Sequence, residues 1–135
     1  MSILVDTSVW SLALRKKSRS FPEKDILKQL IIEGLVRIIG PIRQELLSGI
    51  VEKKQFDKLK TNLSYFPDLI LKTSDFERGA DFFNLCRKRG IQGSHTDFLI
   101  CAVAYSHDLQ IFTTDKDFVQ FNKVLPIKLL GANRL

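Results

Sequence analysis

Four acidic residues in this sequence stand where chemistry can be done. Asp6 and Asp115 each follow directly on a short apolar run that predicts a buried strand, and Glu45 and Asp97 each lie near the start of a segment with helical spacing of apolar residues. Carboxylate oxygens are preferred ligands of Mg²⁺ and Mn²⁺. Such an ion activates a water and stabilises the leaving oxygen in phosphodiester hydrolysis, which is the chemistry these residue types suggest.

Each acid also has a purely structural interpretation. Asp6 and Asp115 can cap the helices that follow them, because Asp is among the preferred capping residues. Asp97 stands three residues after Ser94, which is the spacing of a capping box, and for Asp97 alone that interpretation is the stronger. Glu45 falls on the apolar stripe of its helix, so we expect its carboxylate to be buried and to need either a basic partner or a metal.

The four acids together favour a cation over four separate structural roles. In open α/β sheets, sites form at the carboxyl ends of the strands, and we expect the four acids to converge there. Two carboxylates about 4 Å apart repel each other by roughly 4 kcal/mol at an effective dielectric near 20. Because a domain's net stability is only about 5–15 kcal/mol, such a cluster must take up protons or bind a divalent ion.

Hydroxyl groups stand beside the acids. Thr7, Ser8 and Thr114 can cap helix starts, or they can orient the neighbouring carboxylates. Asp117 lies two residues beyond the last of the four acids and can face either the metal or solvent. We treat these four residues as supporting candidates.

The apolar pattern predicts an α/β fold in one domain, residues 1–135, with the order β-α-α-β-α-α-α-α-β-α-β. Strands separated by helices imply parallel pairing with right-handed crossovers. Residues 16–25 are expected to form a loop, and residues 65–73 a loop or short extended segment. Strands are expected at residues 3–5, 35–40, 109–114 and 124–130, the last at an edge because of Pro126, and helices at 9–14, 26–34, 41–50, 52–63, 74–88, 94–107 and 115–121.

Composition sets limits on the class of protein. Apolar residues make up 44% of the 135 residues and charged residues 27%, and no apolar run approaches the ~20 residues that a membrane span needs. With no signal-like segment at the N-terminus, we expect a cytoplasmic protein without a membrane partner. The net charge of +6 often accompanies a polyanionic partner. Cys86 and Cys101 are expected to be buried thiols, and His95 and His107 lack zinc-site spacing.

The ordered segments LVDTSVW, IRQELLSG, SHTDFLICAVA and LQIFTTDKDF resemble the PIN-domain ribonucleases, and most closely the VapC-type toxins of prokaryotic type II toxin-antitoxin modules. The resemblance covers essentially the whole chain. It implies a three-layer α/β/α domain with a mainly parallel sheet, and a Mg²⁺- or Mn²⁺-dependent endoribonuclease. The catalytic acids would be Asp6, Glu45, Asp97 and Asp115, of which Asp6, Asp97 and Asp115 would bind metal, with Asp117 assisting.

The resemblance further implies an RNA substrate, a homodimer, and an antitoxin that covers or enters the active-site groove. The sequence departs from the family pattern at two places. Phe98 and Cys101 replace small residues behind Asp97, and His107-Asp108 replaces a Gly-containing turn, although Asp can adopt the left-handed conformation that this turn requires. Neither departure changes one of the four acids.

Other functions fit the sequence less well. A phosphotransferase of the haloacid-dehalogenase type needs a second Asp two residues after its nucleophile, where this chain has Ser8, and the acidic pattern of a receiver domain is absent. The alternative that stays open is a catalytically inactive PIN-like module that binds RNA or protein. Basic residues that can contact RNA, or can be ordinary solvated charges, are Arg15, Lys16, Lys17, Arg19, Arg87, Lys88 and Arg89.

Four aromatic residues are candidates for a partner surface, although a core position is the stronger expectation for each: Trp10, Tyr65, Phe66 and Phe82. Phe82 is the best of these candidates because it falls off the stripe that Phe76, Ala80 and Phe83 form on the helix at 74–88.

Overall fold

The computed structural model of the chain describes residues 1–14 and 21–131. In this part of the chain, strands and helices follow the order predicted from the sequence. The strands are β1 (Ile3–Val5), β2 (Val36–Arg37), β3 (Gln110–Phe112) and β4 (Lys128–Leu129). The helices are α1 (Thr7–Leu14), α2 (Pro22–Ile32), α3 (Gly40–Leu47), α4 (Lys53–Leu63), α5 (Thr73–Lys88), α6 (His95–Ser106) and α7 (Asp117–Asn122).

The four strands form one all-parallel sheet in the order β2-β1-β3-β4. The central strand β1 is buried along its length, and Leu4 pairs with Arg37 on one side and with Ile111 on the other. A strand covered on both faces is expected to be a continuous apolar run, as residues 3–5 are. β4 lies at an edge, which confirms the prediction made from Pro126.

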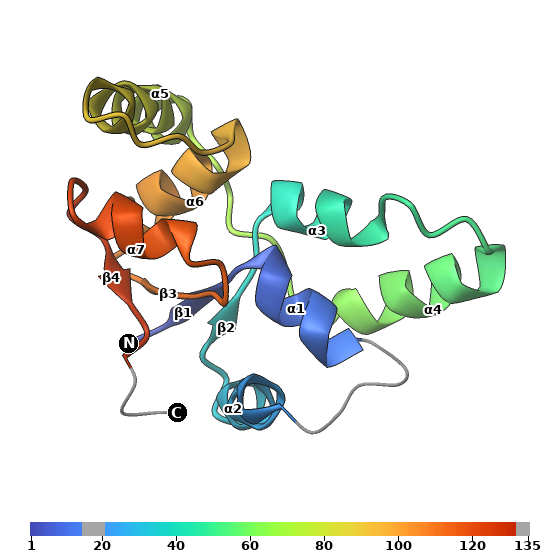
Figure 1. Cartoon of the computed structure of the whole chain (residues 1–135). Coiled ribbons are helices and arrows are strands. Elements are labelled where there is room, and N and C mark those ends of the chain that lie inside the picture. Colours follow the sequence, from blue (N-terminus) through green and yellow to red (C-terminus); the bar gives the residue numbers. More distant parts are fainter. Residues whose placement is uncertain (15–20, 132–135) are drawn as a thin grey trace.

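Helices cover both faces of the sheet in a three-layer arrangement. Figure 1 shows α6 and α7 above the strands, α2 below them, and α5 beyond α6. The helix α6 is buried on every side from Phe98 to Ala104, as its uniformly apolar sequence predicted. No helix in the two described segments is long and apolar enough to cross a membrane.

Several boundaries differ from the expectation: the strands expected at residues 35–40, 109–114 and 124–130 are shorter, and the helix expected at 41–50 ends at Leu47. α2 begins at Pro22, so residues 22–25 belong to a helix and not to the expected loop, because Pro is well suited to the first turn and the acids Glu23 and Asp25 stabilise the helix N-terminus. The rest of that loop, residues 16–20, lies outside the described residues. Residues 65–73 include an extended piece, in which the N–H of Leu69 donates to the carbonyl of Ile38 (2.9 Å) beside β2.

The core position, which was the stronger expectation for Phe82, is confirmed, and its candidacy for a partner surface falls away. The buried face of α5 is formed by Asp75, Gly79, Phe82 and Cys86, and Phe82 is only 4% exposed. Gly79 packs against the backbone of α6, where an added Cβ would lie 3.5 Å from Leu99 Cα. Of the other aromatic candidates, Trp10 is buried, Phe66 is partly buried against it, and Tyr65 is exposed.

Candidate active site

Asp6 follows the last residue of β1 and is 6% exposed. Its backbone carbonyl starts α1 by accepting a hydrogen bond from the N–H of Val9 (3.1 Å), whereas its carboxylate lies toward the end of β3. There, Oδ2 accepts hydrogen bonds from the hydroxyls of Ser8 and Thr113, both at 2.8 Å. Within the described residues, both hydrogen bonds to this carboxylate end on Oδ2, which leaves Oδ1 for another partner.

Thr113 joins two of the acids, and the sequence analysis missed it. Its hydroxyl donates to Asp6 and accepts a hydrogen bond from the N–H of Asp115 (3.0 Å). Thr114, which was predicted in its place, uses its backbone N–H to donate to Ser8 Oγ (3.1 Å). Side chains alternate along an extended segment, so Thr113 and Asp115 share a side that Thr114 does not, and this spacing was the signal available in the sequence.

Asp97 has the structural role considered for it, the capping box at the start of α6. The N–H of Ser94 donates to Asp97 Oδ2 (3.1 Å), and the N–H of Asp97 donates to Ser94 Oγ (3.0 Å), which is the capping box predicted from the spacing. Burial raises the pKa of Asp97, the hydrogen bonds from Ser94 lower it, and the negative charges of Asp6 and Asp115 raise it further. The carboxylates of three acids from distant parts of the chain are therefore electrostatically coupled.

Asp115 lies between β3 and α7, and its Oδ1 accepts a hydrogen bond from the N–H of Asp117 (2.9 Å). This bond orders the turn that leads into α7, but the capping position of that helix is Lys116 and not Asp115. Asp117 is exposed, and the contact that joins it to Asp115 comes from its backbone and not from its carboxylate.

The expectation that Glu45 is buried was wrong. Ile42 and Leu46 are buried, but Glu45 lies at the margin of their stripe on α3 and is exposed. Thr7 Oγ1 donates to Glu45 Oε2 (3.1 Å), which ties α3 to the start of α1 beside Asp6. Glu45 borders an open groove of about 500 Å³, whose other lining residues are Thr7, Pro41, Gln44, Ser48 and Thr96. Thr7 directly follows Asp6 in the chain, and its hydrogen bond therefore holds Glu45 at the rim of the acidic site.

The donor set fits a hard divalent cation in its chemistry. Asp6, Asp97 and Asp115 supply oxygen ligands, as Mg²⁺ and Mn²⁺ prefer. Within residues 1–14 and 21–131, no group of three His, Cys, Asp or Glu side chains is gathered closely enough to hold an ion by direct contacts. The arrangement accordingly suits an ion that is bound directly by one or two carboxylates and keeps several waters, as Mg²⁺ usually does.

The parallel sheet and the acids at the ends of β1 and β3 define an α/β domain of a known class. Residues 3–124 match the model of the PIN domain, and the chain belongs to this family. None of the curated proteins matches the sequence.

Solved structures share the fold at low sequence identity. FitAcB from Neisseria gonorrhoeae is 22% identical, with a TM-score of 0.78 over 98% of this chain and 99% of that one. VapBC2 from Rickettsia felis, bound to a DNA fragment from their promoter, is 17% identical, with a TM-score of 0.77 over 97% and 98%. A toxin-antitoxin complex from Klebsiella pneumoniae is 21% identical, with a TM-score of 0.64 over 87% and 90%.

Proposed function

We propose that the protein is a Mg²⁺- or Mn²⁺-dependent endoribonuclease and the toxin of a toxin-antitoxin pair. The observation that carries this proposal is the placement of Asp6 and Asp115 after the neighbouring parallel strands β1 and β3, where the Thr113 hydroxyl joins the Asp6 carboxylate to the backbone of Asp115. Membership of the PIN family supports a nuclease, and the toxin-antitoxin complexes among the similar structures support the toxin role.

Each residue of the site has a distinct part in the proposed mechanism. Asp6, Asp97 and Asp115 would hold the cation, while the hydroxyls of Ser8 and Thr113 fix the Asp6 carboxylate by hydrogen bonds to its Oδ2. A bound Mg²⁺ or Mn²⁺ supplies charge stabilisation at the phosphate and makes a water a stronger nucleophile. Glu45, positioned by Thr7 at the rim of the site, accepts a proton from the attacking water.

The decisive experiment is incubation of the purified protein with total RNA, with and without Mg²⁺ or Mn²⁺. We expect cleavage only with the metal, and we expect Asp6→Ala and Asp97→Asn to abolish it. Asp97→Asn retains an oxygen that can accept the hydrogen bond from Ser94, so it tests the charge and not the helix cap. Asp25→Asn, at an exposed position on α2, is the matched control and should cleave normally.

Cleavage that survives either site substitution would refute the proposed site. A folded protein that binds RNA in the presence of metal but never cleaves it would support the inactive module instead. We further propose a homodimer and a protein antitoxin as partners, for which the exposed apolar side chains of Tyr65, Ile70 and Phe76 offer contact surface. A small reading frame immediately upstream that encodes a DNA-binding protein would support the toxin role.

A further inference from the structure

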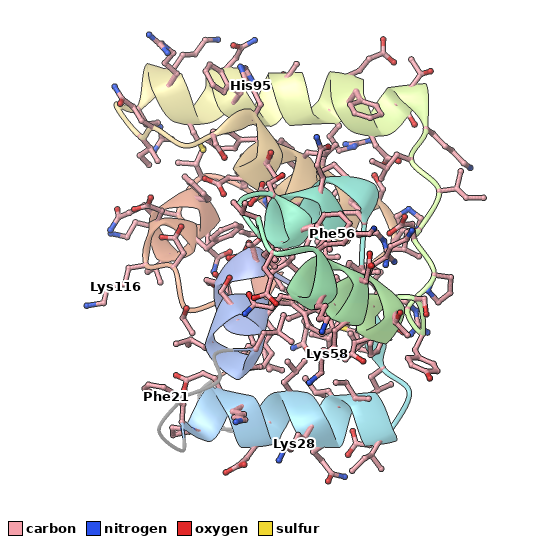
Figure 2. All side chains as sticks on the ribbon, turned by 90° about the vertical axis from the view of Figure 1, so that its right-hand side faces the viewer. Phe21, Lys28, Phe56, Lys58, His95 and Lys116 are labelled. Carbon is pink, nitrogen blue, oxygen red and sulfur yellow. The ribbon has the colours of Figure 1, made fainter. Side chains whose placement is uncertain are left out.

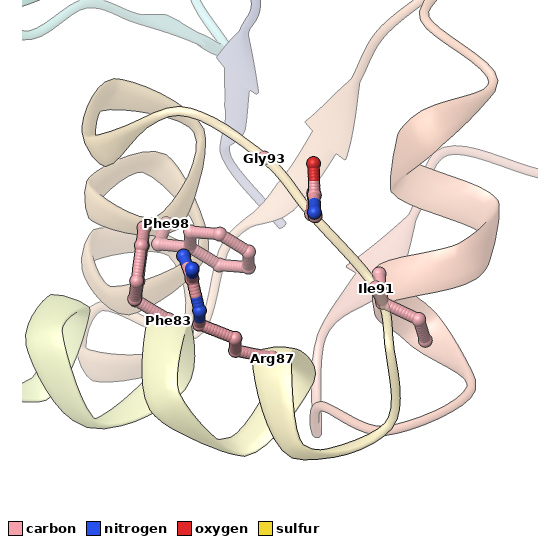
Figure 3. Close-up of a pocket in the computed structure, with 6 residues that line it drawn as sticks. Phe83, Arg87, Ile91, Gly93 and Phe98 are labelled. Carbon is pink, nitrogen blue, oxygen red and sulfur yellow. The ribbon is translucent and has the colours of Figure 1, made fainter.

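A cavity of about 210 Å³ lies where α5 ends and the chain turns toward α6. Figure 3 shows it between the last turns of α5, the connecting loop and the start of α6. Its lining residues are Phe83, Arg87, Ile91, Gln92, Gly93 and Phe98. The volume is below the roughly 300–1,000 Å³ of sites that enclose a whole small molecule, so the cavity suits a single planar group.

Flat aromatic and cationic groups surround this cavity. The rings of Phe83 and His95 are stacked, with their centroids 5.0 Å apart and an angle of 15° between the planes. Phe98 meets Phe83 edge to face at 5.5 Å. The guanidinium of Arg87 lies 5.8 Å from the centre of the Phe83 ring, and Figure 3 shows its side chain reaching back toward that ring. His95 and Arg87 are both exposed and therefore offer planar surfaces to a ligand.

The cavity shares a wall with the acidic site. Gly93, which lines the cavity, is bonded to the backbone nitrogen of Ser94, and this N–H donates to the Asp97 carboxylate at 3.1 Å. Phe98, on another side of the cavity, directly follows Asp97 in the chain. A group seated in the cavity would therefore be separated from the Asp97 carboxylate by the backbone of Gly93 and Ser94.

The wall at Gly93 is fixed by close packing. A Cβ atom at position 93 would stand 2.5 Å from Cζ of Phe121 and 3.0 Å from Cε2 of Phe98, so only glycine lets the loop lie this close to α7 and α6. The separation between the cavity and Asp97 is consequently set by the fold.

We propose that this cavity binds one unpaired base of the RNA, next to the phosphate that is cleaved. The inference rests on the proposed ribonuclease function and adds a substrate subsite to it. Single-stranded RNA is recognised largely by stacking of its bases on aromatic rings and Arg planes and by hydrogen bonds to the base edges. Phe83 and Arg87 supply planes that line the cavity, the exposed amide of Gln92 can donate to and accept from a base edge, and Lys88 and Arg89 add positive charge beside it.

The experiment measures the affinity of the Asp6→Ala protein, which should leave RNA intact, for a short unstructured RNA. A second series of the same RNA carries a single abasic site that is moved through successive positions. We expect one abasic position to weaken binding about 5- to 100-fold, the range expected for loss of one stacked base. Arg87→Lys and Gln92→Ala, introduced into the same protein, should weaken binding of the intact RNA but should add little loss with that abasic RNA.

Arg87→Lys keeps the positive charge and removes the planar guanidinium, so it separates stacking from attraction to phosphate. Arg89→Ala is the matched control, because Arg89 is exposed beside the cavity but does not line it, and it should weaken binding of intact and abasic RNA equally. The base subsite is wrong if the Arg87→Lys and Gln92→Ala variants bind intact RNA with the affinity of the Asp6→Ala parent protein. It is also wrong if each substitution weakens binding of intact and abasic RNA equally.

The affinity measurement does not depend on turnover, so failure of the subsite and failure of the proposed function are distinguishable. Wild-type protein that cleaves RNA, together with cavity variants that have no effect specific to a base, would overturn the subsite alone. A protein that never cleaves but shows the base-specific loss would overturn the catalytic proposal and leave the subsite standing.

Discussion

The Asp6 carboxylate accepts hydrogen bonds from two hydroxyls on the same oxygen, and one of the donors, Thr113, also accepts from the N–H of Asp115. Replacing Thr113 with Val keeps the shape of the side chain and removes both of these bonds. We expect Thr113→Val to weaken the apparent affinity for Mg²⁺ about 10- to 100-fold, as the loss of groups that orient metal ligands typically does. Metal titration of the cleavage rate measures this change.

Thr114→Val is the matched control for Thr113→Val. Thr114 is exposed and contributes its backbone N–H to the network, which Val retains. A normal metal dependence in the Thr113 variant, or an equal loss in the two variants, would contradict the role assigned to the Thr113 hydroxyl.

The raised pKa of Asp97 predicts how the metal-free protein responds to pH. An acid whose native pKa lies above its unfolded value holds its proton more tightly in the native state, so the free energy of unfolding falls as pH rises from the unfolded pKa through the native one. Asp97→Asn removes this titration. In EDTA, the variant should therefore lose less stability than the wild type over that pH window, as measured by thermal unfolding at a series of pH values.

Added Mg²⁺ should reverse this order, because a cation that binds only the native state stabilises the wild type and has lost a ligand in the variant. Asp25→Asn should follow the wild type in both conditions. If the stabilities of Asp97→Asn and of the wild type change in parallel with pH, then burial and the acidic neighbours do not raise the pKa of Asp97.

At the residue scale, the positions of Asp6 and Asp115 after neighbouring strands followed from the sequence, whereas the hydroxyl that joins them did not. Asp6, Asp97 and Asp115 could be placed because each stands at a recognisable end of a strand or start of a helix. The burial of Glu45 could not be predicted reliably, because a position one step from the centre of an apolar stripe turns inward or outward according to the packing of the whole helix. Thr114 was predicted from the sequence and Thr113 was missed, because the exact end of β3 determines which of the two hydroxyls faces Asp6.

At the element scale, Arg43 ties α3 to the end of α4 and to the extended segment that follows it. Its Nε is paired with Asp68 Oδ1 at 3.1 Å, its Nη1 donates to the carbonyl of Leu63 at 2.9 Å, and its Nη2 donates to the carbonyl of Phe66. Lys presents a single ammonium and cannot reach all three acceptors. We expect Arg43→Lys to lower the free energy of unfolding by about 2 kcal/mol, measured by urea denaturation.

Lys53→Ala provides the comparison, because Lys53 pairs with Asp57 at 3.4 Å on the exposed surface of α4, where such a pair contributes less than about 0.5 kcal/mol. Equal effects of the two substitutions would show that the contacts of Arg43 do not hold these elements together.

Replacing either of two glycines, one in α5 and one in the loop that follows it, with Ala should have opposite effects on stability. At Gly79 an added Cβ would meet the backbone of α6 at ordinary contact distances of 3.5 Å and more, so Gly79→Ala should be neutral or stabilise by up to about 1 kcal/mol through its better helix propensity. At Gly93 the same group would collide with Phe121, and Gly93→Ala should destabilise by about 1–3 kcal/mol. Thermal unfolding of the two variants checks both signs.

The facing of α5 shows why patterns within one helix are ambiguous. Two stripes, one step apart, compete on it: Phe76, Ala80 and Phe83 are richer in aromatic side chains, whereas Gly79, Phe82 and Cys86 allow closer approach to α6. The second stripe is buried, because contact between helices rewards a small residue at the crossing point. That preference depends on the partner helix and cannot be counted from the sequence of α5 alone.

At the scale of the whole molecule, the succession of strands and helices followed from the apolar pattern, whereas the lateral order β2-β1-β3-β4 did not. The order of strands and helices along the chain can be predicted because each element has its own local spacing of apolar residues. Lateral order depends on contacts between segments that are far apart in the chain, such as the pairing of β1 with β3 across more than a hundred residues. The convergence of the acids was predictable only because every parallel strand ends at the same edge of such a sheet.

The net charge of +6 leads to a prediction about RNA binding by the whole protein. Each phosphate neutralised on single-stranded RNA contributes about 0.7 to the slope of log affinity against log salt concentration. Of the candidates, Arg87, Lys88 and Arg89 lie within the described residues at the end of α5, Arg87 lining the proposed base subsite and the other two exposed beside it, whereas Arg15, Lys16, Lys17 and Arg19 lie outside them. Replacing both Lys88 and Arg89 with Gln should therefore reduce the slope by about 1.4.

Lys28→Gln is the control for this substitution, because Figure 2 places Lys28 on α2, at the opposite end of the molecule from α5 and His95. Removal of this one charge should leave the slope almost unaltered, since exposed charges farther apart than a Debye length of about 10 Å interact weakly. If the two proteins lose the same slope per charge removed, RNA is attracted by the net charge and has no preferred path across the molecule. A loss confined to the α5 variant would place the RNA backbone along the end of α5, on the side from which a base reaches the cavity beside Asp97.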